Sequence, residues 1–185
     1  KNNIKVTALT RNIHQKGYIL KTQANPGFLE IVEGSIFDHK LIEKLFSSAD
    51  LCVNLIGILF EKGKNNFNNV HAEFPKMISK YASSYKLEKF VHLSALGIDN
   101  ATDSTYAQSK LKGEKEILNN FSKAVIVRPS IVYSVDDNFT TQLMTLLGLL
   151  PIFPIYYNGK TKFRPIFCSD LTNSITKIIT DDIKE

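Results

Sequence analysis

The chain has 185 residues, of which 43% are apolar and 22% are charged, as in an ordinary globular domain. This composition excludes a disordered chain, a collagen-like chain and a disulfide-rich scaffold. The two cysteines, Cys52 and Cys168, lie in apolar stretches, which indicates buried reduced thiols. The sequence as given shows no secretory signal pattern and no apolar run long enough to span a bilayer.

The formal net charge is +5, from 23 basic and 18 acidic side chains. The lysines are spread along the chain and form no basic cluster interleaved with aromatic residues, so we expect no nucleic-acid partner. The four histidines lack the spacing of a metal site, and we expect no resident metal. Of these, His92 is expected to be a core residue of a strand.

The first third of the chain alternates short apolar runs with segments of helical period. Apolar and β-branched runs predict strands, and apolar residues three and four apart predict helices. Asp38 stands where its carboxylate can cap a helix. In chain order we expect a strand over residues 4–9, a helix over 14–21, a strand over 29–32, a helix over 41–47 and a strand over 51–56.

The remaining elements continue the alternation after a polar loop at 61–66. Pro75 lies inside the first expected helix of this part and predicts a kink or a late start. Asp136 or Asp137 is expected to cap one helix, and Ser169 or Asp170 the last one. In chain order we expect a helix over 67–85, a strand over 90–93, a helix over 104–121, a strand over 124–127, a helix from 136–137 to 150, a candidate strand over 162–167 and a helix over 171–179.

Strands and helices that alternate at this spacing predict right-handed βαβ units. The fold class is therefore α/β, a doubly wound, Rossmann-like parallel sheet with helices on both faces. No internal repeat and no linker divides the sequence, so we expect a single domain over 1–185. Ligands of such sheets bind beyond the carboxyl ends of the strands.

The strongest chemical signal is the segment Tyr106-Ala-Gln-Ser-Lys110. Residues four apart share one face of a helix, so the phenol and the ammonium lie one turn apart. An ammonium beside a phenol stabilises the phenolate, and we expect Lys110 to lower the pKa of Tyr106 toward neutrality. Such a tyrosine can exchange a proton with a substrate oxygen during hydride transfer. The pattern alone is common, and an ordinary surface helix pair is the alternative.

Ser94 strengthens the catalytic interpretation of this pair. It follows the expected strand 90–93 and precedes Tyr106 by 12 residues. At the carboxyl end of a parallel strand its hydroxyl can bond the same substrate oxygen as the phenol. We therefore predict one catalytic site made of Ser94, Tyr106 and Lys110, with Tyr106 as the general acid or base.

The Ser…Tyr-x-x-x-Lys arrangement resembles the short-chain dehydrogenase/reductase superfamily. More specifically, the chain is similar to the atypical branch that includes the nucleotide-binding accessory subunit of respiratory complex I and its bacterial relatives. The similar stretches follow the family's order along nearly the whole chain. They are 53–59, 92–97, 106–110 with 113–115, 128–133, 137–139 and 159–161.

The resemblance implies an NAD(P) cofactor and a place for its adenosine ribose beside Arg11. An acidic residue there would bond the ribose of NAD, whereas an arginine favours the 2′-phosphate of NADP. We therefore expect NADP(H) to be favoured over NAD(H). A solvated strand-end charge is the plain interpretation of Arg11.

The resemblance also implies cofactor contacts at the ends of the other strands. Two residues should flank the adenine, three should lie beside the cofactor at the end of the central strand, and four should pass near the nicotinamide, with Tyr106 and Lys110 completing the set. In that order they are Ser35 and Ile36; Leu55, Ile56 and Gly57; and Pro129, Ser130, Ile131 and Val132.

The sequence departs from the family in lacking the glycine-rich loop that faces the pyrophosphate. We expect this loop in a first βα unit of about 20–30 residues that precedes Lys1. The 185 residues would then be a fragment of a dinucleotide-binding domain and would by themselves bind a dinucleotide poorly. Residues 134–185 are expected to begin the substrate-side region.

An apolar segment, 146–157, is broken by Pro151 and Pro154. It is too short and too rich in proline to span a membrane. The plain interpretation is a helix end followed by a covered loop. The functional one is a lip over the substrate cleft or a contact with a membrane-bound partner.

Two main functions remain open from the sequence. The first is an NAD(P)(H)-binding protein resembling the complex I accessory subunit, in which the dinucleotide serves mainly structure or regulation. The second is a free NAD(P)-dependent reductase or epimerase/dehydratase that uses the Ser-Tyr-Lys site on a sugar-nucleotide, isoprenoid or quinone-type substrate. A redox sensor of the same superfamily ranks third, because such sensors more often lack the tyrosine.

The first function implies complex I as a partner at the membrane surface. The expected location is then the bacterial cytoplasm, with peripheral attachment at the inner membrane, or the matrix side of a mitochondrion. The sequence leaves the substrate open, and whether any catalysis occurs is open as well.

Overall fold

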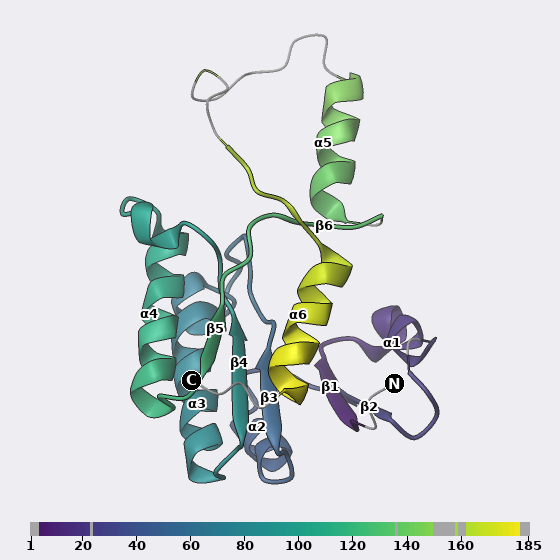
Figure 1. Cartoon of the computed structure of the whole chain (residues 1–185), viewed down its shortest axis with the longest axis vertical. Helices are drawn as coiled ribbons and strands as arrows, with labels where there is room; N and C mark the ends of the chain where they lie inside the picture. Colours follow the sequence, from purple (N-terminus) through teal and green to yellow (C-terminus); the bar gives the residue numbers. More distant parts are fainter. Residues whose placement is uncertain (1–3, 23, 136, 150–157, 159–161, 182–185) are drawn as a thin grey trace.

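The structure is a computed structural model that describes residues 4–22, 24–135, 137–149, 158 and 162–181 (Figure 1). The predicted cap Asp136, the stretch 150–157 of the apolar segment and the similar stretch 159–161 lie outside the described residues. The first elements are β1 (Val6–Thr10), α1 (Ile13–Thr22), β2 (Leu29–Glu33), α2 (His39–Phe46), β3 (Leu51–Asn54), the π-helical turn η1 (Asn69–Glu73) and α3 (Phe74–Ser84). They are followed by β4 (Lys89–Leu93), the 3₁₀ turn η2 (Ile98–Asn100), α4 (Thr105–Asn120), β5 (Val125–Val127), β6 (Val132–Tyr133), α5 (Asn138–Leu149), β7 (Ile166–Phe167) and α6 (Cys168–Thr180).

All pairings between the described strands are parallel, as predicted. Hydrogen bonds join β1 to β2, β3 to β4 to β5, and β6 to β7. The described part of β1 is not hydrogen-bonded to β3, so the described strands form three hydrogen-bonded groups. The α/β class with parallel strands is confirmed, and the carboxyl ends of β3, β4 and β5 lie at one edge.

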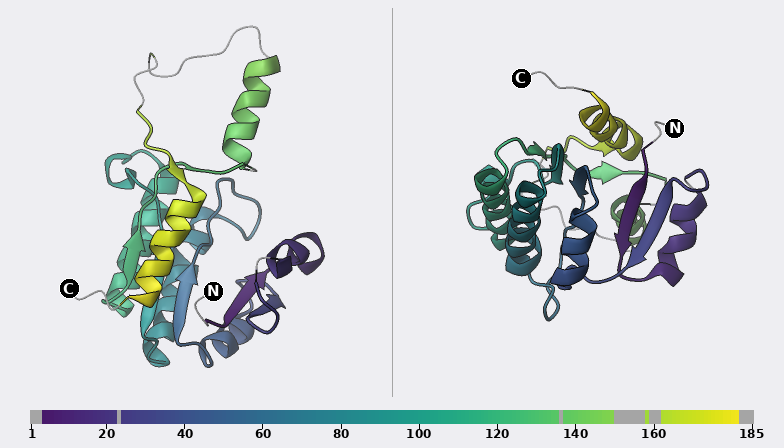
Figure 2. Two further views of the ribbon diagram at one scale, coloured as in Figure 1. Left: turned by 45° about the vertical axis from the view of Figure 1, so that its right-hand side comes forward. Right: turned by 90° about the horizontal axis from the view of Figure 1, so that it is seen from below.

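Strand β4 lies at the centre of the packing, with helices on both of its faces (Figure 2). Successive side chains of a strand point to opposite faces. Phe90 accordingly packs in one apolar cluster with residues of α2, α3 and α4, and Val91 packs in a second one with Leu171 and Ile175 of α6. The doubly wound arrangement is therefore realised around β4.

Three of the helix starts have capping side chains, and all three lie at a predicted cap position or at the predicted start of the helix. Asp38 accepts a hydrogen bond from the Leu41 amide at 3.1 Å, and Asp137 accepts one from the Thr140 amide at 2.7 Å. Ser104 accepts a hydrogen bond from the Ala107 amide at 3.3 Å, at the expected start of α4. Each cap satisfies an amide that a helix leaves unpaired at its first turn.

The end of the chain departs from the sequence prediction. Helix α6 begins at Cys168, directly after β7, and its first turn has no capping side chain, so neither Ser169 nor Asp170 caps it. The expected strand over 162–167 is a strand only at Ile166–Phe167, where it pairs with β6. A two-residue pairing of this kind depends on a partner far away in the sequence, and local patterns do not reveal it.

The expected helix over 67–85 is divided at its first third. The π-helical turn η1 precedes α3, and Pro75 lies in the first turn of α3, which confirms the predicted late start. Proline has no amide hydrogen to donate to the carbonyl four residues earlier, and its ring clashes with that carbonyl. That carbonyl belongs to His71, so the backbone widens into a π-turn there.

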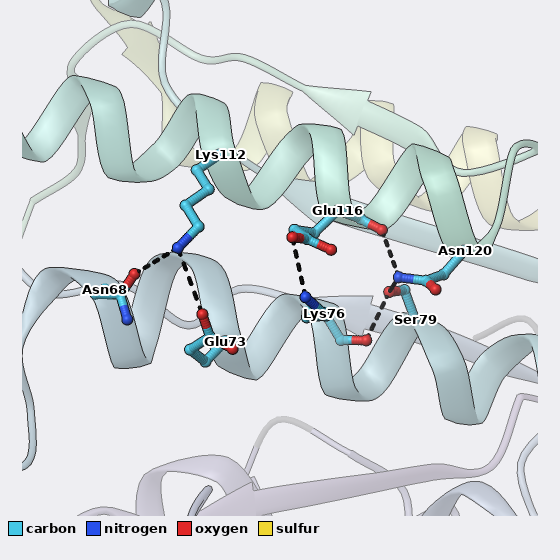
Figure 3. A network of polar contacts seen from close by, with 7 residues as sticks. All are labelled: Asn68, Glu73, Lys76, Ser79, Lys112, Glu116 and Asn120. Atoms are coloured by element: carbon cyan, nitrogen blue, oxygen red, sulfur yellow. Dashed lines mark hydrogen bonds and ion pairs between the residues drawn. The ribbon is translucent and has the colours of Figure 1, made fainter.

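Polar side chains join α3 and η1 to α4 along their exposed side (Figure 3). Lys112 donates to Asn68 at 2.8 Å and pairs with Glu73 at 3.4 Å, while Lys76 pairs with Glu116 at 3.2 Å. Exposed pairs of this kind contribute little to the free energy of unfolding. They do specify how α4 lies along α3, and α4 carries Tyr106 and Lys110.

The described helices include none that is long and apolar enough to cross a membrane.

Candidate functional site

Ser94 is placed directly after β4, as predicted. Its amide donates to the carbonyl of Val127 at 2.8 Å, which continues the pairing with β5 beyond the strand. The side chain is 6% exposed, and its Oγ has no hydrogen-bond partner among the described residues. A buried hydroxyl without a partner is costly, which makes Ser94 a candidate ligand contact.

Lys110 connects α4 to the end of β4. Its side chain is 5% exposed, and Nζ donates to the carbonyl of Leu93, the residue before Ser94, at 3.3 Å. Burial lowers the pKa of Lys110, and the nearby carboxylate of Glu114 acts in the opposite direction. Glu114 is itself buried and accepts a hydrogen bond from Nε of Arg128 at 2.9 Å. The structure thus brings Lys110 next to the backbone of the predicted serine.

Tyr106 lies one helical turn before Lys110 and is half-buried. Its ring meets the rings of His71 and Phe67 edge-on, with centroids 5.2 and 5.7 Å away. Burial raises the pKa of Tyr106 above its ordinary value. The expected lowering of this pKa by Lys110 is therefore wrong, because the ammonium is directed at the Leu93 carbonyl and the loss of solvent dominates.

The loop after β3 contains three of the predicted cofactor residues. Gly57 lies against the side chain of Lys110, since a Cβ atom there would be 3.2 Å from Lys110 Nζ. Any side chain would interfere with this close approach. Leu55 is 59% exposed, and the half-buried Ile56 packs against the core. The structure therefore brings Gly57 and Lys110 together and leaves Leu55 open to solvent.

The predicted adenosine contacts lie on the strand pair β1–β2. Arg11 is exposed directly after β1. Ser35 is exposed after β2, and its Oγ accepts a hydrogen bond from the Phe37 amide at 3.2 Å. Ile36 is buried in the main apolar cluster, so its side chain contributes to the core. These residues occupy strand ends, as predicted, but the described contacts do not join them to Ser94, Tyr106 or Lys110.

The stretch 129–132 runs from the end of β5 into β6. The carbonyl of Pro129 accepts from the Leu96 amide, and that of Ile131 accepts from the Ile166 amide, each at 2.9 Å. Ser130 is half-buried, and Val132 packs against the cluster of α6. Ile131 also lines a cavity of about 280 Å³ together with Tyr133, Thr140, Phe163 and Pro165. This cavity lies on the predicted substrate side.

The polar partners beneath the site were not predicted from the sequence. His71 is buried, and its ring nitrogens contact the Ile58 amide and the Ser109 hydroxyl. A signal was available, because His71 lies four residues after Phe67 and three before Phe74, on the buried face of the expected helix.

A second buried polar pair involves His92, whose predicted core position is confirmed. Its Nδ1 lies 3.0 Å from Nδ2 of Asn54, whose Oδ1 accepts from the Ile56 amide at 3.1 Å. Burial, with Lys110 nearby, lowers the pKa of His92 to about 3. Nε2 of this ring has no partner among the described residues. Asn54, at the end of β3, was not predicted to be a site residue, because a buried asparagine can be identified only from its hydrogen-bond partners in the structure.

Within the described part of the chain, no group of three or more His, Cys, Asp or Glu side chains is arranged to hold a metal ion. The polar groups of the site are instead hydroxyls, amides, two neutral histidines and one lysine. Such a set suits hydrogen bonding to an organic ligand with oxygen atoms.

The chain matches no established family model. Subunit 9 of the mitochondrial NADH dehydrogenase [ubiquinone] 1 alpha subcomplex of Mus musculus is 26% identical over 162 residues, which cover 88% of this chain and 43% of that protein. The ceramide reductase of Caulobacter vibrioides is 25% identical over 127 residues, which cover 69% of this chain and 40% of that protein. The chain thus spans less than half the length of these curated relatives.

The similarity in three dimensions extends over almost the whole chain. The dTDP-glucose 4,6-dehydratase DesIV of Streptomyces venezuelae, solved with NAD and TYD bound, superposes with a TM-score of 0.75. The aligned part has 17% identity and covers 96% of this chain and 63% of the dehydratase. The chain therefore has the fold of short-chain dehydrogenase/reductases of the NAD-dependent epimerase/dehydratase type and is a distant homologue of the accessory subunit of respiratory complex I.

Proposed function

We propose that the chain is part of an NAD(P)(H)-binding accessory protein of respiratory complex I, in which the dinucleotide serves mainly structure or regulation. The observation that carries this proposal is the homology with the mouse subunit, which extends along 88% of the chain. The positions of Arg11, Gly57 and Ser94 beyond the carboxyl ends of β1, β3 and β4 support a dinucleotide bound at these strand ends. The proposed domain comprises 1–185, with the substrate side starting at 134.

The proposed site needs a glycine-rich turn that this sequence does not contain. We place it in a strand–turn–helix unit outside these 185 residues. The division of the described sheet supports this placement, because β1 pairs only with β2 and β3 pairs only with β4 in the described residues. A parallel strand between β1 and β3 would join both groups and set its glycine-rich turn at the same edge.

Association with complex I is tested in the cells that produce the protein. Membranes are solubilised gently, complexes are separated on a native gel, and the gel is probed for this chain. The proposal expects the chain to migrate with complex I, and loss of the chain to reduce the amount of intact complex. Migration only with free soluble proteins would contradict the proposal and favour the enzyme considered below.

The preference for NADP(H) is tested at Arg11. An exposed guanidinium at the end of β1 can bind a ribose 2′-phosphate with two hydrogen bonds. Replacing Arg11 by alanine in the full-length protein should weaken NADPH binding about tenfold or more and leave NADH binding nearly unchanged. Lys5→Ala, near the start of β1, is the matched control and should change neither affinity. Equal losses for both dinucleotides would refute this role of Arg11.

The second candidate function is a free NAD(P)-dependent reductase or epimerase/dehydratase. This function is favoured by the buried Oγ of Ser94, which has no hydrogen-bond partner among the described residues and follows Leu93, whose carbonyl is bound by Lys110. The ceramide reductase among the relatives supports it as well. With its pKa raised by burial, Tyr106 is protonated at neutral pH and is suited to donate a proton to a substrate oxygen. A bound dinucleotide would supply or accept the hydride. The substrate would be a sugar nucleotide, an isoprenoid or a quinone-type compound.

The catalytic role is tested with Tyr106→Phe in the full-length protein. This change removes the proton donor and keeps the ring, so turnover should fall about 100-fold while cofactor binding changes little. Tyr85→Phe, on the exposed end of α3, is the control and should retain full turnover. Unchanged turnover of Tyr106→Phe would eliminate Tyr106 as the acid.

A further inference from the structure

His71 joins two parts of the candidate site that are distant in sequence. Its Nε2 accepts a hydrogen bond from the Ile58 amide at 3.1 Å, in the loop after β3. Its Nδ1 lies 2.9 Å from the hydroxyl of Ser109 on α4, and that hydroxyl donates to the Tyr106 carbonyl at 2.7 Å. The imidazole ring itself supports the Tyr106 ring edge-on.

These contacts determine the protonation state of His71. A nitrogen that accepts from an amide carries no proton, so Nε2 is unprotonated. The Ser109 hydroxyl uses its single proton on the Tyr106 carbonyl, so its oxygen can only accept from His71, and Nδ1 must carry the proton. The ring is therefore neutral, in one tautomer, with both nitrogens satisfied.

The backbone around His71 is adapted to this position. His71 is the middle residue of the π-helical turn η1, and such turns are frequent at functional sites. Helix α4 approaches the turn so closely that a Cβ atom on Gly113 would lie 1.8 Å from the His71 carbonyl oxygen. The imidazole ring of His71 thus lies between the loop after β3 and helix α4, the two segments that it connects.

We propose that His71 is a positioning residue that holds the loop 54–58 at a set place relative to Tyr106 and Lys110. This inference rests on the proposed dinucleotide site, because that loop carries Leu55, Ile56 and Gly57. Gly57 lies within reach of both groups, since a Cβ there would be 3.2 Å from Lys110 Nζ and 3.7 Å from His71 Nε2. A small rotation of the histidine would therefore shift the loop on the lysine.

The charges around His71 favour its neutral form. Lys110 on α4 faces it with a positive charge, and the third polar group in this layer, His92 on β4, is neutral as well. Burial is the main cause that lowers the pKa of His71 to about 4, and the positive charge of Lys110 is the second cause. Glu73, on the same turn, is exposed and paired with Lys112. The ring therefore stays an acceptor for the Ile58 amide across the physiological pH range.

The first test is the tautomer of His71 in the unchanged protein, read from ¹⁵N and ¹H spectra of ¹⁵N-histidine-labelled, full-length material. The proposal expects one histidine in the Nδ1–H form, which is the minor form in water, and expects it to remain neutral well below pH 6. The resonance is assigned by its loss in His71→Gln. The Nε2–H form, or protonation near pH 6.5, would overturn the proposal.

The second test is hydrogen exchange at the Ile58 amide together with the dissociation constant for NADPH. Loss of the hydrogen bond in His71→Gln should speed exchange of that amide about fivefold or more and raise the dissociation constant. Ser109→Ala, which removes only the hydroxyl, should shift both in the same direction. Ile78→Val, a core change in α3, is the control for general loss of stability and should leave both near the unchanged values.

The outcomes separate this inference from the proposed function. If the unchanged protein fails to bind NADPH or NADH, the dinucleotide site is refuted, while the tautomer and the Ile58 exchange rate still decide whether His71 holds the loop. If His71→Gln is folded and its Ile58 amide exchanges as slowly as before, the positioning role is overturned. Equal acceleration in Ile78→Val would overturn it too.

Discussion

Two regions of the molecule differ in how far their apolar side chains are buried. The first region is formed by β3, β4, α3 and α4, and the second is helix α5. In the first region Phe90, Ile78 and Ile117 are almost completely buried. In α5, Met144 is 72% exposed and Leu149 is 76% exposed. Figure 1 shows α5 extending away from the strands that carry the site. The predicted acid, serine and lysine all belong to the first region, and Thr140 of α5 lines the cavity beside Ile131.

This difference in burial indicates which part of the protein can hold functional side chains in fixed positions. Around Lys110, several buried polar groups have hydrogen-bond partners that come from other elements. Helix α5 depends more on local interactions, such as the Asp137 cap. Catalytic and cofactor groups need positions held by several neighbours, and the buried region meets that need. Substitutions that perturb packing should therefore have large effects there and small effects in α5.

The largest effect is expected from Gly113→Ala. Its new Cβ would lie 1.8 Å from the His71 carbonyl oxygen, so η1 and α4 would have to separate. We expect a loss of about 3 kcal/mol in the free energy of unfolding, measured by urea denaturation. Gly148→Ala in α5 is the matched control, because no atom of the described residues lies within 4 Å of its Cβ position.

The control should behave in the opposite way. Alanine favours a helix by about 1 kcal/mol over glycine, so Gly148→Ala should leave the stability unchanged or raise it slightly. A Gly113→Ala protein as stable as the Gly148→Ala protein would mean that α4 does not pack on η1 as the structure has it.

The second effect is a loss of stability in acid. In the folded protein burial lowers the pKa of His71 to about 4 and that of His92 to about 3, while the unfolded chain has ordinary values near 6.5. The unfolded chain therefore binds more protons below pH 6.5, so the stability is complete above that pH and declines as the pH falls toward 4. Two such groups should cost about 2 kcal/mol between pH 6 and pH 5.

This decline is measured by urea unfolding at the two pH values. His71→Gln should reduce the pH dependence by about half, because one of the two buried bases is gone. His39→Gln, at an exposed position of α2, should keep the full dependence. A dependence that is unchanged in His71→Gln would show that other groups cause it.

The sequence predicted the order of elements well because that order is encoded locally. The apolar run of β3, the cap Asp38 and the break at Pro75 each act within a few residues, and all are seen. The pairing of β6 with β7 is not local, and the four residues before β7 were wrongly assigned to a strand.

The proximity of Lys110, Gly57 and the end of β4 could be expected from the sequence, but the electrostatics around Tyr106 could not. The spacing of Tyr106 and Lys110 and the strand end at Ser94 are properties of the sequence, and the structure gathers Lys110, Gly57 and the β4 end as expected. The direction of the Tyr106 pKa was wrong because it depends on burial and on where the ammonium points. His71 was missed because its partners, Ile58 and Ser109, lie 13 and 38 residues away.

The smallest effect comes from comparing two ion pairs of the same helix. Glu114 is buried beside Lys110 and is bound by Arg128, which also pairs with Asp99 at 2.6 Å. Glu116, by contrast, is only half-buried and pairs with the partly exposed Lys76. Removing Arg128 leaves a buried carboxylate without its fork of donors, so Arg128→Ala should cost about 1–2 kcal/mol in the free energy of unfolding. Lys76→Ala should cost less than about 0.5 kcal/mol.

The variant Arg128→Lys separates the contribution of the positive charge at position 128 from that of the planar guanidinium geometry. Lysine keeps the positive charge but cannot bond both carboxylate oxygens with a planar fork, so it should restore only part of the loss. In high salt the effect of Lys76→Ala should vanish, since its pair is partly exposed, while that of Arg128→Ala should persist. If both losses were equal and equally sensitive to salt, Glu114 would be solvated like Glu116, in contradiction to its buried position in the structure.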